Sequence, residues 1–263
     1  MACILIPLLL SLNLSAATRV IVTVVEPKTG RAITGLKAQD FNLTEDKKPL
    51  RIEAAEFSRD TIDVMLLLDS SLVGPMVQPM AESLIGQLQP KEQMAIVAYH
   101  SSADLIQDFT SSRQLLSRAV AKVTYGNTPH VLDALYAAID GGFQGSSFRR
   151  IIVLVTAGVE GRSRVNEQEV IRLARRNGVS IFPVYMMGNE KSMFELLSRQ
   201  TGGAYFNLKD LKKAGDNNPG ARIFEVLREH YTLTLSGNLR LGEKLRIEVK
   251  RPEKLFASAL PIE

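Results

Sequence analysis

The chain has 263 residues, of which 45% are hydrophobic and 23% are charged, so it can bury a full core and is not a disordered or fibrous protein. A net charge of +4, no Trp and 6% aromatic residues, without a recognition motif, argue against nucleic-acid binding. The single cysteine, Cys3, excludes a disulfide framework and a cysteine-based metal site.

Residues 1–17 predict a secretory signal peptide. Residues 4–12 are apolar, and Ser15, Ala16 and Ala17 supply the small side chains of a cleavage site. The apolar run is too short to span a bilayer comfortably, and no later segment reaches that length. We therefore expect export to the periplasm or the extracellular space, without membrane insertion of the mature chain. An uncleaved anchor is the alternative, because no Lys or Arg precedes the apolar run.

Both ends of the mature chain have β texture. In residues 18–58, a β-branched run at 20–25 precedes alternating segments at 41–44 and 50–57. Residues 216–263 are expected to contain a helix and further alternating strands, at 231–235 and 245–249. Each end alone has too few strands to bury a core. We therefore predict that the two ends pair into one small β-sandwich.

Residues 59–215 alternate between buried strands and amphipathic helices. Four short apolar runs of strand length lie at 64–68, 95–99, 151–156 and 179–185. Helices are expected at 75–89, 112–123, 129–141, 166–177 and 190–200. This order predicts an α/β fold with a doubly wound, mostly parallel sheet, inserted into the sandwich. Residues 105–109 are expected as an antiparallel strand at the sheet edge.

The first of these apolar runs ends in a polar group, Asp69-Ser70-Ser71-Leu72-Val73. In an open parallel sheet, ligands bind beyond the carboxyl ends of the strands. Here the chain resembles the von Willebrand factor type A (vWA) superfamily. Its metal-ion-dependent adhesion site joins Asp-x-Ser-x-Ser after the first strand, a distant Thr and an Asp after a later strand. Asp69, Ser71 and Thr128 match this motif.

Two positions depart from the motif. Val73 replaces the second Ser, and Ala157 replaces the second Asp, so one ligand oxygen and one negative charge are lost. Mg²⁺ demands nearly octahedral oxygen coordination, which neither side chain supplies. We expect no cofactor, or weakly bound Mg²⁺ or Mn²⁺, with water or Glu160 as conceivable substitutes for the lost groups.

The resemblance extends over nearly the whole mature chain. The segments at 35–46, 231–235 and 249–252 resemble the flanking strands of a secreted bacterial vWA-related family. What the resemblance implies is protein binding, because members commonly coordinate a partner's carboxylate through the metal.

Four further residues are candidates for the ligand-binding face: Ser70, His100, His130 and Glu160. The predicted topology places both histidines at the same sheet edge as Asp69. They could replace metal ligands or act as acid and base, but loop histidines that bond to backbone or water are the favoured interpretation.

The leading hypothesis is an exported protein-protein interaction module with a degenerate metal site and no enzymatic activity. The first alternative is a structural scaffold in which Asp69 and Ser71 serve only as local hydrogen-bond acceptors. A hydrolase that uses Ser71 is the third and is disfavoured, because the sequence lacks a Gly-x-Ser-x-Gly elbow at this position.

Overall fold

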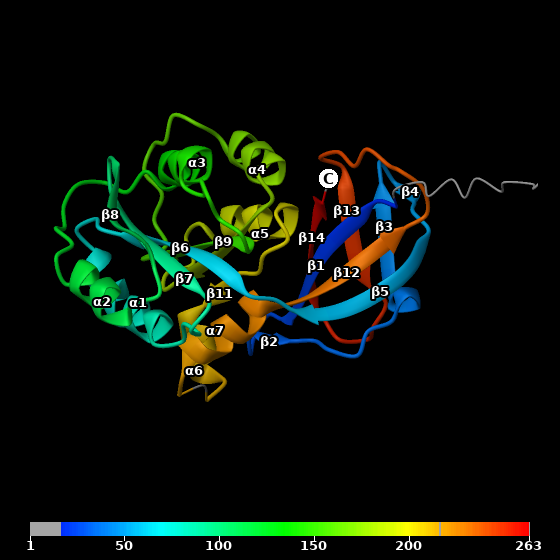
Figure 1. The fold of residues 1–263 in the computed structure, drawn as a ribbon, viewed down its shortest axis with the longest axis horizontal. Coiled ribbons are helices and arrows are strands. Elements are labelled where there is room, and N and C mark those ends of the chain that lie inside the picture. Colours follow the sequence, from blue (N-terminus) through cyan, green and yellow to red (C-terminus); the bar gives the residue numbers. More distant parts are fainter. Residues whose placement is uncertain (1–16, 216, 263) are drawn as a thin grey trace, which may run out of the picture.

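The computed structural model describes residues 17–215 and 217–262, so nearly all of the predicted signal peptide lies outside the described residues. An α/β unit and a β-sandwich lie side by side along the long axis (Figure 1). Within the described ranges, no helix is long and apolar enough to cross a membrane.

The α/β unit is built on a six-stranded sheet with the order β11-β10-β9-β6-β7-β8. Its strands are β6 (Ile62–Asp69), β7 (Gln93–Tyr99), β8 (Ala103–Thr110), β9 (Arg149–Thr156), β10 (Val179–Tyr185) and β11 (Phe206–Asn207). All neighbours are parallel except β8, which pairs antiparallel with β7 at the sheet edge. The predicted edge strand is thus present, whereas the two-residue β11 is too short to give a periodic signal.

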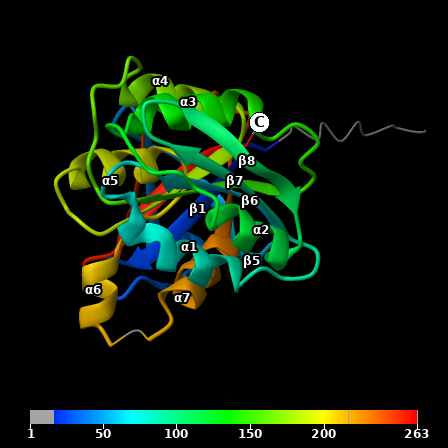
Figure 2. The same cartoon turned by 90° about the vertical axis from the view of Figure 1, so that its left-hand side faces the viewer.

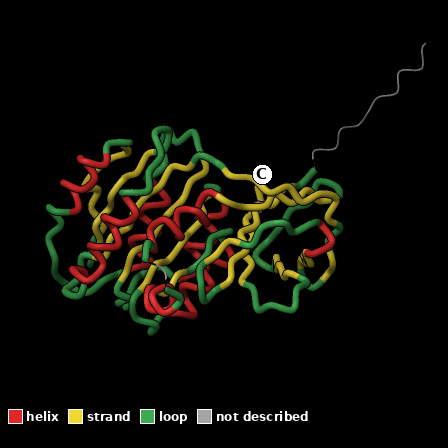
Figure 3. Tube along the Cα trace, turned by 90° about the horizontal axis from the view of Figure 1, so that it is seen from below, coloured by secondary structure: helices red, strands yellow, loops and turns green. Residues whose placement is uncertain are grey.

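Helices cover both faces of this sheet (Figures 2 and 3). They are α1 (Gln78–Ile85), α2 (Arg113–Val120), α3 (Val131–Gly141), α4 (Glu167–Arg176), α5 (Lys191–Gln200), α6 (Leu208–Lys213) and α7 (Pro219–Arg228). In β6, Val64, Leu66 and Leu68 pack in the core beneath α1, α2 and α7. Met65 and Leu67 pack in the opposite core with α3, α4 and α5. This double burial explains the continuous apolar runs.

The helix expected at 75–89 is shorter in the structure. Residues Gly74–Val77 form a 3-10 helix, η2, and α1 begins only at Gln78. A side chain at position 74 would come within 2.3 Å of the Asp69 carbonyl oxygen. The chain is therefore held tightly against the end of β6 before the regular helix begins.

The two chain ends together form the sandwich, as their alternating patterns predict. One sheet has the order β14-β1-β12-β5, with β2 beside β1, and the other has the order β13-β3-β4. These strands are β1 (Arg19–Glu26), β2 (Arg31–Ala32), β3 (Phe41–Glu45), β4 (Lys48–Pro49), β5 (Ile52–Arg59), β12 (Glu229–Leu235), β13 (Leu245–Val249) and β14 (Phe256–Ile262). A short 3-10 helix, η1 (Ala38–Asp40), precedes β3.

Strand β1 lies between two strands from the other end of the chain. It pairs antiparallel with β12 and β14. Val20, Val22, Phe41 and Tyr231 share one buried core between the two sheets. The predicted fold class is confirmed, while the boundaries placed at residues 58 and 215 stay predictions.

A buried ion pair ties α7 to the amino end of β7. Arg228 donates from Nε and Nη2 to the two carboxylate oxygens of Glu92, at 2.7 Å each, and from Nη2 to the Gln87 carbonyl at 2.8 Å. Its guanidinium also lies 4.9 Å from the centre of the Phe224 ring. Because β12 follows Arg228 directly, this pair holds the point where the chain returns to the sandwich.

Candidate functional site

The Asp69 carboxylate lies at the carboxyl end of β6, between the ends of β7 and β9. It is fully buried and already has three donors within the protein. Oδ1 accepts the Ser71 N–H at 2.9 Å, and Oδ2 accepts the Ala157 N–H at 3.0 Å and the Thr156 hydroxyl at 3.2 Å. Asp69 therefore joins the loop after β6 to the loop after β9.

Three buried hydroxyls lie in the loops and strand ends around Asp69 without satisfied hydrogen bonds. The three oxygens are Ser71 Oγ, Tyr99 Oη and Tyr125 Oη. Each is buried, and none has a hydrogen-bond partner of good geometry among the described residues, although Tyr99 lies close to Thr156. Burial and the Asp69 charge raise the pKa of both tyrosines, Tyr99 well above its usual value. Both phenols are therefore protonated at neutral pH and remain potential donors.

The oxygen donors fall short of the set that Mg²⁺ requires. Val73 and Ala157 offer no side-chain oxygen, and Thr128 is an exposed residue for which no hydrogen bond to Asp69 is found in the described part of the chain. No group of three or more His, Cys, Asp or Glu residues that could hold a metal ion occurs in residues 17–215 and 217–262. Asp69, Ser71 and Thr128 alone do not fit a nearly octahedral ion.

Glu160 is turned to the start of α3. Its carboxylate accepts the Val131 N–H at 2.7 Å, and the N–H and hydroxyl of Ser163. This contact satisfies one of the free amides of the helix end. Burial raises the pKa of Glu160 despite these bonds. Glu160 thus stabilises the start of a helix, and its hydrogen bonds among the described residues go to Val131 and Ser163 and not to the loop around Asp69.

The two histidines of this edge are neighbours through the backbone. The His130 N–H donates to the His100 carbonyl at 2.8 Å, and His130 is the residue that precedes α3. The His130 ring lies 3.8 Å from the Asp133 carboxylate, and His100 Nδ1 accepts the Ser101 N–H. Neither ring forms a hydrogen bond with Ser70 or Ser71 among the described residues. His100 Nδ1 lies 3.0 Å from the hydroxyl of its neighbour Ser101, so Ser71 has no histidine beside it as a base.

The loop from residue 70 to residue 77, here called the β6 loop, is apolar where it meets solvent. Leu72 is 78% exposed, Met76 50% and Val73 38%. Gly74 fixes the path of the loop by its close approach to the Asp69 carbonyl. Large exposed apolar side chains clustered in one loop mark a contact surface more often than isolated ones do.

Sequence reasoning missed Thr156, Tyr99 and Tyr125, which surround Asp69. Thr156 and Tyr99 end β9 and β7, the two strands beside β6, and both strands reach the same sheet edge as Asp69. Their position as the last residue of a strand is the signal that could have identified them. Tyr125 lies in a loop, and no pattern in the sequence predicts its approach to Asp69.

Solved structures similar to this chain share its α/β unit. A conserved hypothetical protein, BatB, from Bacteroides thetaiotaomicron is 11% identical, with a TM-score of 0.51 over 63% of this chain and 98% of that one. Proximal thread matrix protein 1 from the mussel byssus, whose metal-ion-dependent adhesion site is occupied by zinc, is 14% identical. It has a TM-score of 0.54 over 73% of this chain and 50% of that one. At these identities the likeness concerns the fold alone.

No curated protein matches this chain. The family model of the von Willebrand factor type A domain matches residues 63–218, which is more than half of the sequence. This match agrees with the sheet order and with the placement of Asp69 at the end of β6. The chain belongs to the von Willebrand factor type A domain family.

Proposed function

We propose that this protein is an exported binding module that contacts a protein partner through the β6 loop, without a metal ion. Domains of this family commonly mediate protein interactions. The observation that carries the proposal is the exposure of Leu72, Val73 and Met76 directly after Asp69. Burying a Leu or Met side chain against a partner contributes about 1.5–3 kcal/mol before the costs of association.

The bonding of Asp69 supports a metal-free mode of binding. Its two carboxylate oxygens accept three internal hydrogen bonds, and positions 73 and 157 lack the oxygens that a cation would need. A partner carboxylate would meet the Asp69 charge without an intervening cation. We therefore expect the partner to present an apolar side chain to this face.

Binding accounts for the site better than catalysis does. Ser71 Oγ has no hydrogen-bond partner among the described residues, and so lacks the base that a nucleophilic serine requires. We propose no enzymatic role for the chain. Export is likewise part of the proposal and depends on the apolar residues 4–12 followed by small residues.

A scaffold role is the second candidate, and the three bonds to Asp69 favour it, because they suffice to explain why an Asp stands there. In that case the β6 loop would have no partner. The two candidates differ in whether Leu72 contacts another protein in the cell.

The experiment places a photoactivatable amino acid at position 72, and at position 105 as a matched control. Leu105 is 59% exposed and lies on the edge strand β8, outside the β6 loop. We expect one discrete crosslinked species of higher mass from position 72 in living cells, and none of that mass from position 105. Equal crosslinking at both positions, or none at position 72, would support the scaffold role instead.

A further inference from the structure

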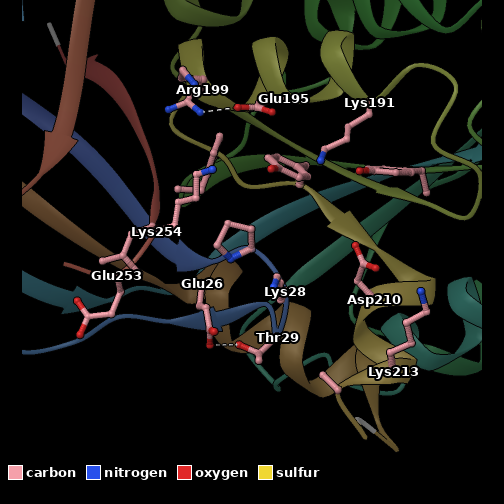
Figure 4. A pocket seen from close by; sticks show the side chains of 16 residues that line it. Glu26, Lys28, Thr29, Lys191, Glu195, Arg199, Asp210, Lys213, Glu253 and Lys254 are labelled. Carbon is pink, nitrogen blue, oxygen red and sulfur yellow. Dashed lines mark hydrogen bonds and ion pairs between the residues drawn. The ribbon is translucent and has the colours of Figure 1, made fainter. Parts of the chain in front are cut away.

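A cavity lies between the sandwich and the α/β unit (Figure 4). A cavity of about 1020 Å³, here called the junction cavity, is lined by the turn between β1 and β2, by α5 and α6, and by the segment before β14. None of the residues around Asp69 lines it. Cavities of this size at domain junctions are typical ligand sites.

One wall of the junction cavity is aromatic. The rings of Tyr185 and Tyr205 are nearly parallel, with centroids 6.5 Å apart, and Phe256 meets Tyr205 edge to face at 4.9 Å. The Arg199 guanidinium already has partners within the wall. It lies 4.4 Å from the centre of the Phe256 ring and donates to the Glu195 carboxylate at 2.6 Å. This wall therefore presents an apolar surface to the cavity.

The Tyr185 hydroxyl is the unpaired polar group of this wall. Tyr185 is fully buried. Its hydroxyl lies near Asn207 but has no hydrogen-bond partner of good geometry among the described residues. Burial, followed by the nearby Tyr205 and Asp210, raises the pKa of Tyr185 to about 12. The hydroxyl is therefore protonated at neutral pH, and a buried donor without a partner is costly unless a ligand satisfies it.

Charged side chains of both signs enter the junction cavity from three elements. In Figure 4, Lys191 of α5 points in from above, Lys28 from the β1–β2 turn lies below, and Asp210 of α6 faces the same space. Unlike Arg199, these three side chains form no ion pair within the described part of the chain. Lys213, Lys254 and Glu253 also line the cavity, so side chains of both charge signs are available to a ligand.

We propose that the junction cavity binds a peptide segment that carries a carboxylate, a cationic group and an apolar side chain. The carboxylate lies between Lys28 and Lys191, the cation lies at Asp210, and the apolar side chain packs on Tyr205 and Phe256. Tyr185 donates to a peptide carbonyl. Because the lining carries both signs of charge, a ligand with both charges fits it better than a simple anion does. This site does not depend on the β6 loop.

The test uses a random tetrapeptide library with free termini, passed over the immobilised protein, with the retained peptides identified by mass spectrometry. We expect enrichment of peptides that combine both charge signs with an apolar residue. A double variant, Lys28→Ala with Lys191→Ala, should retain at least about tenfold less peptide than the wild type, because each lysine supplies a charge-assisted hydrogen bond. An unenriched pool, or one enriched in a single charge sign, would overturn the proposal.

Tyr185→Phe separates binding from folding. It removes a hydroxyl without a partner, so the urea midpoint should stay the same or rise, while peptide retention falls about fivefold. Retention equal to wild type would show that the hydroxyl is not used and would overturn its assignment.

Leu72→Asp is the matched control at the β6 loop and should leave peptide retention unchanged. A loss of retention in this variant would mean that the two sites are one.

Discussion

Because His230 is buried, we predict that the folded protein loses stability in mild acid. It is the second residue of β12, is 4% exposed, and lies where the sandwich joins the α/β unit. Its Nε2 lies 3.5 Å from the Asp60 carboxylate, while Nδ1 has no partner among the described residues. Burial, and then the charge of Arg149, lower the pKa of His230 to about 4, although Asp60 acts in the opposite direction.

The sign and size of the effect follow from proton linkage. The unfolded chain has a His pKa near 6.5, so between about pH 6.5 and pH 4 it binds the proton that the native protein excludes. Stability is fully present above pH 6.5 and is lost as the pH falls toward 4. A difference of about 2.5 pKa units at ~1.4 kcal/mol per unit amounts to about 3 kcal/mol.

Urea unfolding at several pH values between 7.5 and 4 measures this loss, with His230→Gln as the variant that cannot bind the proton. Over this range, we expect the free energy of unfolding to fall by about 3 kcal/mol more in the wild type than in the variant. His100→Gln, which alters a partly exposed histidine, should keep the wild-type slope. Equal slopes for wild type and His230→Gln would refute the reasoning.

Four further substitutions test other contacts of the fold by their effect on stability. Glu92→Gln leaves Arg228 buried without its counter-charge and should lower the free energy of unfolding by about 3 kcal/mol. Glu195→Gln, in the more exposed pair with Arg199, should cost less than about 1 kcal/mol, and similar costs for both would contradict this account. Asp69→Ala strips three donors of their acceptor and should cost roughly 3 kcal/mol in the same urea assay, whereas an unchanged midpoint would show that the bonds contribute nothing. Gly158→Ala combines a φ of +98° with a Cβ 2.0 Å from the Met187 carbonyl oxygen, so a cost below about 1 kcal/mol would be unexpected.

The periodic parts of the fold were predictable because burial on both sheet faces leaves a direct mark on the sequence. The run at 64–68 consists only of apolar residues because alternate side chains enter two different cores. The pairing of the two chain ends followed from counting strands. The short elements η2, α6 and β11 left too few periods to be recognised.

The site was predictable in its position but not in its bonding. The end of a strand fixes where Asp69 lies, but the path of the following loops decides what contacts it. Glu160 could have faced the site or α3, and only the loop from 157 to 163 turns it to the Val131 amide. The junction cavity was not predictable at all, because its walls come from both units and from segments about 230 residues apart.

The central claim is that the β6 loop binds a protein partner without a metal. The most direct measurement is the yield of the position-72 crosslink in cell extract, with excess Mg²⁺ and Mn²⁺ or with excess EDTA. We predict the same crosslinked species in equal yield under both conditions. A crosslink that disappears in EDTA and returns with either metal would contradict the account, and would show that Asp69, Ser71 and Thr128 bind a cation despite Val73 and Ala157.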